Sequence, residues 1–261
     1  MMTRDGRAAE LSAAGLPTLY IDFDGTLHES ARVYGPAFRS VYEELTDDGL
    51  VPPAEITEEM ICTWLGTPSR YPWDLLAPDL DPVLRDAAIR EVGGRMNCLI
   101  DDGIGRLFPG TEETLDALAA AGYPMVLLSN STVSYIDMNR RAYGLDRWFS
   151  DYVLIEAYPH CPTKSAMLAE YLRAHAADAA DADETAAHAG RPAGIVIGDR
   201  RYDMEAAREN GLPFIACDYG YAPAGELDGA DVRAAEIREL PAAAAAVPQL
   251  PKHPYNNMRK E

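Results

Sequence analysis

Two aspartates, Asp22 and Asp24, stand two positions apart where an apolar run of the sequence ends. In an extended strand, residues i and i+2 point to the same side, so the two carboxylates would face one common space. A buried carboxylate is costly unless it is paired or metal-bound, and two neighbouring carboxylates also repel each other. The pair therefore indicates either a site that supplies a compensating cation or two acids in a solvated turn, which is common for an isolated pair of this spacing.

Other polar residues stand beside further apolar or helical segments of the chain. Ser129 and Asn130 could donate hydrogen bonds, Lys164 is a cation, and Asp199 and Asp203 are two further acids. Taken singly, each has an ordinary structural explanation, such as a helix cap for the serine or a surface position for the lysine. Taken together, the acids need a hard cation, and a cation with serine and lysine suits a multiply charged oxyanion. Clustered carboxylates favour Mg²⁺, which commonly bridges to phosphate.

The elements that must position these residues alternate along the chain. Five short apolar runs bounded by turn residues predict strands, and helical patterns lie between them; the runs are Leu19–Phe23, Met125–Leu128, Tyr152–Ile155, Ile195–Ile197 and Pro213–Cys217. Strands that alternate with helices at this rhythm indicate an α/β fold, a doubly wound parallel sheet covered on both faces. In such sheets ligands bind beyond the carboxyl ends of the strands, which is where the polar residues stand.

Roughly eighty residues between the first strand and Phe108 contain no convincing strand, far more than an ordinary connection needs. Within them, three segments have helical patterns: Ala37–Leu45, Glu58–Leu65 and Pro82–Cys98. We therefore expect a small helical cap domain at residues 33–105, inserted into an α/β core formed by residues 16–32 and 106–240. An Ala/Asp-rich stretch at 174–192 is expected to fray into a solvated loop, and 241–261 to be a loose tail.

The composition narrows the possible partners and the compartment. The formal net charge of −19 over 261 residues repels polyanions, which disfavours nucleic acid and anionic membranes. We expect no transmembrane helix, because no run approaches about twenty apolar residues, and no secretory signal, because the N-terminus lacks an apolar stretch. The four cysteines are scattered without CxxC spacing, which argues against a zinc site or a disulfide framework and fits a reducing cytoplasm.

In this order, the segments DFDGT, LLSNS, Lys164 and GDRRYD resemble the four motifs of the haloacid dehalogenase superfamily of phosphotransferases. The resemblance runs from about residue 19 to residue 232, and its first and last motifs are the specific ones. The helical insertion after the first motif matches the small helical cap of that superfamily. The segment from residue 197 to 231 further resembles the phosphoglycolate phosphatase-like branch, although YGYA stands where that branch has a YGYG-like segment.

The resemblance implies that Asp22 is the nucleophile that forms an aspartyl-phosphate. It implies that Asp24 protonates the leaving oxygen and then deprotonates the hydrolytic water. Other positions would bind or lie against the phosphoryl group: Gly25, Thr26, Ser129, Asn130 and Lys164. The implied ligands of Mg²⁺ are the Asp22 carboxylate, the backbone carbonyl of Asp24, Asp199 and Asp203.

Two residues outside these motifs have open roles. Arg70 lies in a Gly/Pro-rich break of the predicted cap, where it could bind a second anionic group of the substrate or be an ordinary surface arginine. His28 could face the site or lie at the hinge between core and cap, and the hinge is favoured.

The leading hypothesis is a Mg²⁺-dependent phosphatase, a monomer or weak dimer, acting on a small phosphorylated metabolite. Phosphoglycolate, a nucleoside monophosphate and a sugar phosphate all remain open as substrates. A phosphomutase or 5′-nucleotidase of the same superfamily is an alternative, although Thr26 resembles phosphatases better than the Val common in mutases. Asp24 disfavours a dehalogenase, which lacks the second aspartate, and the filled catalytic positions disfavour a non-catalytic phosphometabolite-binding module.

Overall fold

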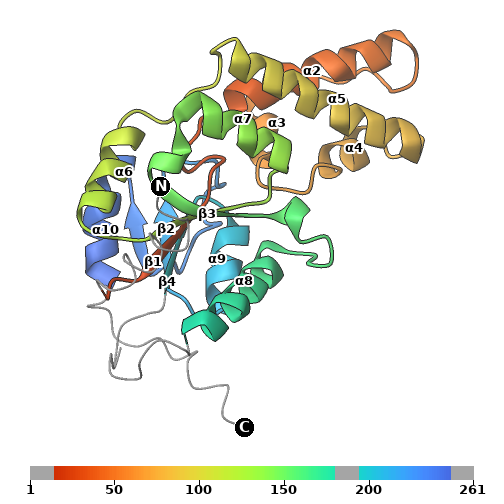
Figure 1. Ribbon diagram of the computed structural model, residues 1–261. Coiled ribbons are helices and arrows are strands. Elements are labelled where there is room, and N and C mark those ends of the chain that lie inside the picture. Colours follow the sequence, from red (N-terminus) through yellow and green to blue (C-terminus); the bar gives the residue numbers. More distant parts are fainter. Residues whose placement is uncertain (1–14, 180–193, 248–261) are drawn as a thin grey trace.

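The computed structural model describes residues 15–179 and 194–247 of the chain (Figure 1). Its strands form one sheet in the order β3-β2-β1-β4-β5-β6, and every neighbouring pair is parallel. Their bounds are β1 Thr18–Ile21, β2 Met125–Ser129, β3 Phe149–Leu154, β4 Gly194–Gly198, β5 Phe214–Cys217 and β6 Val232–Ala234. The strand order changes direction at β1, between β2 and β4, and ligands bind at such a point in doubly wound sheets. The predicted fold class is confirmed.

Successive side chains of each strand enter opposite hydrophobic cores. Leu19 and Ile21 of β1 pack in one core, whereas Tyr20 packs in the other, because side chains alternate across a strand. Helices cover both faces, as Figure 1 shows: α6 Thr111–Ala120, α7 Val133–Tyr143 and α10 Leu240–Ala246 on one, and α8 Lys164–Ala179 and α9 Arg201–Glu209 on the other. Short 3₁₀ turns occur at Leu145–Arg147, Ile155–Ala157 and Ile237–Glu239.

Helix α7 illustrates how local sequence sets the ends of an element next to the site. It begins after Thr132, whose Oγ1 accepts a hydrogen bond of 3.3 Å from the backbone N–H of Tyr135. It ends at Gly144, which has a φ of 62° and thus the left-handed conformation that glycine adopts without strain. Thr132 and Gly144 thus set where α7 begins and ends, and Tyr135 in its first turn is buried against the sheet.

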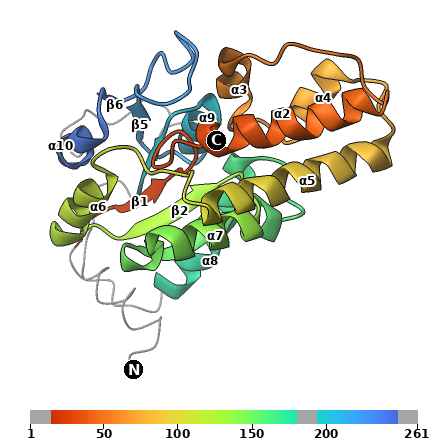
Figure 2. The ribbon, with the colours of Figure 1, turned by 90° about the horizontal axis from the view of Figure 1, so that it is seen from above.

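A group of helices lies between β1 and α6 and forms the cap: α2 Ala31–Asp47, α3 Glu58–Trp64, α4 Tyr71–Leu76 and α5 Pro82–Asp101. Figure 2 shows α2 and α5 side by side, extending away from the sheet. These helices have a hydrophobic core of their own, in which Phe38, Tyr42 and Trp73 are almost fully buried. A separate core is what an inserted domain needs in order to keep its shape while it moves relative to its neighbour.

The two connections between sheet and cap run beside each other. His28 of the outgoing chain and Leu107 of the returning chain form an antiparallel bridge, and the Glu29 N–H donates a 2.8 Å hydrogen bond to the Arg106 carbonyl. The structure thus places the backbone of His28 in the paired linker. Hinge motion of the cap would act on these two linker segments.

The C-terminal boundary differs from the expectation. Residues 241–246 were predicted to be part of a loose tail, but they belong to α10, and Ala243, Ala244 and Val247 are buried in the core that α6 also covers. A run of alanines has no hydrophobic periodicity, yet its small side chains allow close packing of one helix on another. Residues 248–261 and the expected loop at 180–192 lie outside the described residues.

Besides α10, other elements of the fold were missed or misplaced by the sequence patterns. Helix α2 begins at Ala31 rather than at Ala37 and continues through Pro36, a residue that usually marks a helix start or break. Helix α4 occupies a segment expected to be irregular, and the edge strand β6 is too short to show a periodic pattern. No helix within the two described ranges has the length and apolar character needed to cross a membrane.

Candidate active site

Three buried carboxylates meet at the carboxyl edge of the sheet. Asp22 follows β1, Asp199 follows the neighbouring strand β4, and Asp203 lies in the first turn of α9. The Asp22 N–H continues the ladder between the two strands by donating a 2.9 Å hydrogen bond to the Ile197 carbonyl. One carboxylate oxygen of each residue lies within 4.8 Å of the others, so these three members of the expected site are brought together.

Lys164 is the cation of this cluster. Its ammonium group donates hydrogen bonds of 2.7 Å to Asp22 Oδ1 and 2.6 Å to Asp203 Oδ1, and the residue is buried. Burial opposes the charged form, but the carboxylates of Asp203 and Asp22 outweigh it and hold the pKa of Lys164 above its usual value. Lys164 is the first residue of α8, so the helix start fixes where the ammonium group enters the site.

The cluster has a deficit of positive charge, and burial together with this deficit raises the pKa values of two of its carboxyl groups. Burial and the charge of Asp203 raise the pKa of Asp22 well above its ordinary value. The same two causes raise the pKa of Asp199 to about 7, although a hydrogen bond from the Tyr221 N–H opposes the shift. One ammonium group does not balance three carboxylates in this buried space. This donor set fits Mg²⁺, a hard divalent cation that prefers carboxylate oxygens.

The loop after β1 closes tightly around Asp199. Gly25 has a φ of 81°, and a Cβ atom there would lie 2.2 Å from Asp199 Oδ2, so only glycine fits. Thr26 Oγ1 donates a 3.3 Å hydrogen bond to Asp199 Oδ1, and the Tyr221 N–H donates one of 2.6 Å to Oδ2. Gly25 and Thr26, expected beside the substrate, therefore shape and orient one of the acids.

Asp24 has different neighbours from Asp22. Ser131 Oγ donates a 2.5 Å hydrogen bond to Asp24 Oδ2, the Tyr135 hydroxyl donates one of 2.9 Å to Oδ1, and Ser30 also donates to Oδ1. The side chain of Asp24 is only half-buried and is not one of the three clustered carboxylates. The two acids of the opening motif thus occupy chemically distinct positions, one beside a lysine and one held by hydroxyl groups.

His28 lies behind Asp24 in the interior. Its Nδ1 atom is 2.9 Å from Ser30 Oγ, and its Nε2 atom is 3.3 Å from the Tyr143 hydroxyl. Burial lowers the pKa of His28 to about 4, so the ring is neutral near neutral pH. With the proton on Nδ1, His28 donates to Ser30 and accepts from Tyr143, which leaves the Ser30 hydroxyl free to donate to Asp24.

Ser129 and Asn130 stand at the end of β2, next to β1. Ser129 is buried, and its Oγ accepts a 3.1 Å hydrogen bond from the Ser131 N–H. The Asn130 side-chain amide points to the cap, where it lies 3.5 Å from the Gly66 carbonyl. Ser131 was not expected to contact Asp24, although its place directly after Asn130 in the same motif could have suggested it. Tyr135 was also not expected there, because nothing in its helical sequence pattern indicated a contact with Asp24.

Arg200 connects the core to the cap. Its guanidinium donates to the backbone carbonyls of Thr63 (3.3 Å) and Leu65, and its Nε donates a 2.8 Å hydrogen bond to Glu226. The residue is buried at this junction. The cap loop that follows α3 therefore rests on the residue next to Asp199.

Arg70 occupies a more open position. Its side chain is 70% exposed, and its Nε lies 2.9 Å from Asp74 Oδ2, four residues further along the chain. Asp74 also pairs with Arg85 of α5. The closest ionic partner of Arg70 is thus within the cap itself rather than in the carboxylate cluster.

Comparisons of the sequence with known proteins show which family this chain belongs to. The family of haloacid dehalogenase-like hydrolases matches residues 20–217. The phosphoglycolate phosphatase of Haemophilus influenzae (strain 86-028NP) is 26% identical over 211 residues, which cover 77% of this chain and 84% of that protein. The phosphoglycolate phosphatase of Yersinia pestis is 29% identical over 211 residues, covering 77% and 80%.

Solved structures show the same fold. A haloacid dehalogenase-like hydrolase from Streptococcus pneumoniae superposes with a TM-score of 0.69 at 22% identity, covering 88% of this chain and 98% of that one. CbbY from Rhodobacter sphaeroides, solved with phosphate, gives a TM-score of 0.66 at 20% identity, covering 86% and 96%. The family match extends from β1 to β5 and includes the whole carboxylate cluster, which confirms the resemblance seen in the sequence. The chain belongs to the haloacid dehalogenase-like hydrolase family and is a hydrolytic enzyme.

Proposed function

We propose that the protein is a Mg²⁺-dependent phosphatase that hydrolyses a small phosphomonoester through an aspartyl-phosphate on Asp22. The observation that carries the proposal is the contact of the Lys164 ammonium with both Asp22 and Asp203 inside a cluster of three buried carboxylates. A carboxylate attacks a phosphate dianion only where positive charge offsets the repulsion between them. The curated relatives, which are phosphoglycolate phosphatases, support phosphate-ester hydrolysis as the reaction class.

Mg²⁺ would be held by the carboxylates of Asp22, Asp199 and Asp203 and by the backbone carbonyl of Asp24. When bound, Mg²⁺ supplies positive charge that offsets the cluster and the phosphoryl oxygens. The raised pKa values of Asp22 and Asp199 support this assignment, since both reflect carboxylates that are buried beside another acid without a sufficient counter-charge.

In the first half-reaction, the Asp22 carboxylate attacks phosphorus and the ester P–O bond breaks. Asp24 gives its proton to the leaving oxygen. In the second half-reaction, Asp24 takes a proton from a water molecule, that water attacks the same phosphorus, and the Asp22 carboxylate is released with inorganic phosphate. The hydroxyl groups around Asp24 would hold its carboxyl group in one orientation for both proton transfers.

The remaining residues would bind and orient the phosphoryl group. Lys164, already within hydrogen-bond distance of Asp22, would contact a phosphoryl oxygen beside the nucleophile. Ser129 and the backbone of Asn130, at the end of β2, would donate to the other oxygens. Gly25 lets the backbone of the loop approach closely, and Arg70 would bind a second anionic group of a dianionic metabolite. The enzyme would act in the cytoplasm as a monomer or weak dimer.

The test is a screen of the purified protein with Mg²⁺ against para-nitrophenyl phosphate and a panel of small phosphorylated metabolites. Phosphoglycolate, nucleoside monophosphates and sugar phosphates belong in the panel. Asp22→Asn is the inactive variant, and Asp86→Asn, which removes an exposed carboxylate of α5, is the matched control. Release of phosphate by the wild type and the control but not by Asp22→Asn is expected. Binding of a metabolite without phosphate release, or rearrangement to an isomeric phosphate, would contradict the proposal.

A further inference from the structure

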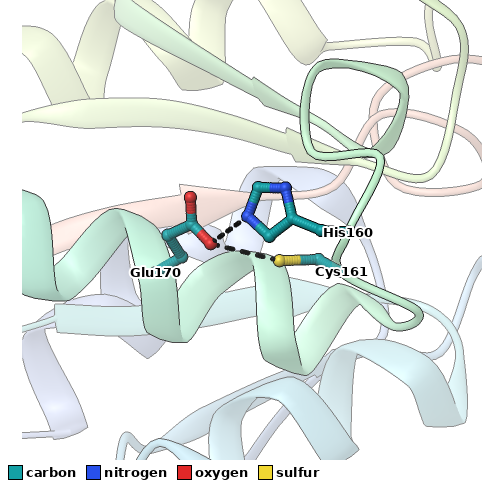
Figure 3. Close-up of side chains that lie close together, drawn as sticks. All are labelled: His160, Cys161 and Glu170. Carbon is teal, nitrogen blue, oxygen red and sulfur yellow. Dashed lines mark hydrogen bonds and ion pairs between the residues drawn. The ribbon is translucent and has the colours of Figure 1, made fainter.

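A second group of metal-binding side chains lies away from the carboxylate cluster. His160 and Cys161 are consecutive residues in the turn between β3 and α8, and Glu170 lies on α8. Figure 3 shows the three side chains converging, with dashed lines from one oxygen of Glu170 to both His160 and Cys161. Glu170 Oε2 is 2.6 Å from His160 Nε2 and 3.4 Å from Cys161 Sγ. One donor atom from each residue lies within 4.8 Å of the others.

Against the expectation from the cysteine spacing, which covers only sites with paired cysteines, we propose that His160, Cys161 and Glu170 bind a Zn²⁺ ion. One imidazole nitrogen, one thiolate sulfur and one carboxylate oxygen are a donor set that Zn²⁺ accepts, and three protein ligands leave a fourth position for water. The set differs in kind from the all-oxygen cluster around Asp22, which suits Mg²⁺. The proposal rests on these side chains alone and is independent of the reaction catalysed at Asp22.

One of the donor–donor distances already suits a tetrahedral site, and another would have to lengthen. Bonds of about 2.0–2.3 Å at tetrahedral angles separate neighbouring donor atoms by roughly 3.3–3.8 Å. The distance of 3.4 Å between Cys161 Sγ and Glu170 Oε2 is within this range, and the 2.6 Å between His160 Nε2 and Glu170 Oε2 would lengthen by about 1 Å. The side chains of His160 and Glu170 are 66% and 33% exposed, so they can adjust and an ion can reach them.

The charges at the cluster fit replacement of a hydrogen-bonded proton by a metal. The thiol of Cys161 donates a hydrogen bond to Glu170 Oε2, so its proton lies between two of the proposed donor atoms. On binding, bonds form from Zn²⁺ to Nε2, Sγ and Oε2, and the thiol proton passes to solvent.

The position of the site gives it a structural consequence. Cys161 stands three residues before Lys164, and Glu170 lies on the helix that Lys164 begins. A metal bond between turn and helix would restrain the chain segment that delivers the Lys164 ammonium to Asp22 and Asp203. Anything that binds the folded state and not the unfolded one raises thermal stability, so we expect Zn²⁺ to raise the melting temperature.

The test uses the full chain in excess Mg²⁺, which occupies oxygen-only sites and competes poorly for sulfur and nitrogen ligands. Co²⁺ serves as a spectroscopic substitute for Zn²⁺, because a Co²⁺–thiolate bond produces a charge-transfer absorption in the near ultraviolet. Cys161→Ser should lose this absorption. Cys98→Ser, which removes an exposed cysteine of the cap helix α5, should retain it.

Competition with a chelating dye gives the Zn²⁺ affinity itself. Glu170→Gln and His160→Gln each remove a direct ligand and should weaken Zn²⁺ binding at least about tenfold, since loss of even an indirect partner costs this much. Melting curves without metal check that each variant is folded, and at the same Zn²⁺ concentration the rise in melting temperature should be smaller in both variants than in the wild type. A charge-transfer band that persists in Cys161→Ser, or a Zn²⁺ affinity unchanged in Glu170→Gln, overturns the proposal.

Discussion

The hydroxyl group of Tyr135 donates a 2.9 Å hydrogen bond to the Asp24 carboxylate. Tyr135 is buried in the core on α7, whereas Asp24 lies in the loop after β1. Burial raises the pKa of Tyr135 well above its ordinary value, so the hydroxyl remains a donor at neutral pH. The orientation of the proposed acid–base residue is thus set from the interior of the core domain.

Tyr135→Phe should lower kcat and leave KM for para-nitrophenyl phosphate nearly unchanged, because it removes a hydrogen bond to the proposed acid–base carboxylate without touching the phosphate ligands. A hydrogen bond to a charged group contributes roughly 1.5–3 kcal/mol, which predicts a loss of about ten- to a hundredfold in kcat. Tyr143→Phe, which removes a hydroxyl that contacts His28 rather than Asp24, is the matched control. An unchanged kcat in Tyr135→Phe would show that Asp24 keeps its orientation without this bond.

Asp22→Asn and Asp24→Asn should fail at different steps. Neither variant should turn over, but para-nitrophenolate leaves without a proton, so Asp24→Asn should still form the aspartyl-phosphate and then stall. Rapid mixing should reveal a burst of about one para-nitrophenolate per Asp24→Asn molecule and no burst in Asp22→Asn. A burst in Asp22→Asn, or full turnover in either variant, would contradict the proposed roles.

Chelation with EDTA should abolish activity, and Mg²⁺ should restore it. Two unit charges about 4 Å apart repel by about 4 kcal/mol at an effective dielectric of 20, which corresponds to several hundredfold in rate. Several such repulsions act between the phosphate and the carboxylates of Asp22, Asp199 and Asp203 when Mg²⁺ is removed. The rate of phosphate release after rigorous chelation is the measurement, and an unchanged rate would mean that the acids serve another purpose.

Acidification should destabilise the protein through His28. The unfolded state binds a proton near the ordinary pKa of about 6.5, whereas the folded state does so only near a pKa of about 4, so stability falls as the pH drops between these values. The shift corresponds to about 3 kcal/mol. The measurement is the free energy of unfolding of the wild type and of His28→Asn at pH 7.5 and at pH 4. The difference between the two proteins should fall by about this amount from pH 7.5 to pH 4.

Taking the difference is necessary because the raised pKa values of Asp22 and Asp199 act in the opposite direction, adding stability as the pH falls. Those contributions are present in both proteins and cancel. A difference that is independent of pH would show that His28 is protonated as readily in the folded as in the unfolded state.

Arg70→Ala should raise KM for a dianionic metabolite while sparing para-nitrophenyl phosphate, which has no second anionic group. A charge-assisted contact predicts a fall of about ten- to a hundredfold in kcat/KM for the metabolite only. Arg85→Ala is the matched control, because Arg85 shares the ion-pair partner Asp74. Equal effects of the two variants would assign Arg70 to the structure of the cap rather than to the substrate.

The amino-acid sequence by itself determined that strands alternate with helices and at which edge of the sheet the polar residues would gather, whereas the order of the strands within the sheet came from the structure. Apolar runs followed by polar residues identify strand ends, and in a parallel sheet all carboxyl ends lie at one edge. For this reason Asp22 and Asp199 were predictable as neighbours, and the structure places them together with Lys164, which begins helix α8 rather than following a strand. The long strandless interval likewise predicted an inserted helical cap, because a loop of that length cannot stay structureless in a compact fold.

Tertiary structure alone decided which side chains surround each acid. Tyr135 reaches Asp24, and Glu170 reaches Cys161, only because α7 and α8 pack on the sheet and its connecting turns in one register. Helix α10 joins the core through alanines that carry no periodic signal. Local propensity and periodicity report what a segment can form, whereas the partners of a side chain depend on how segments distant in the chain pack against each other.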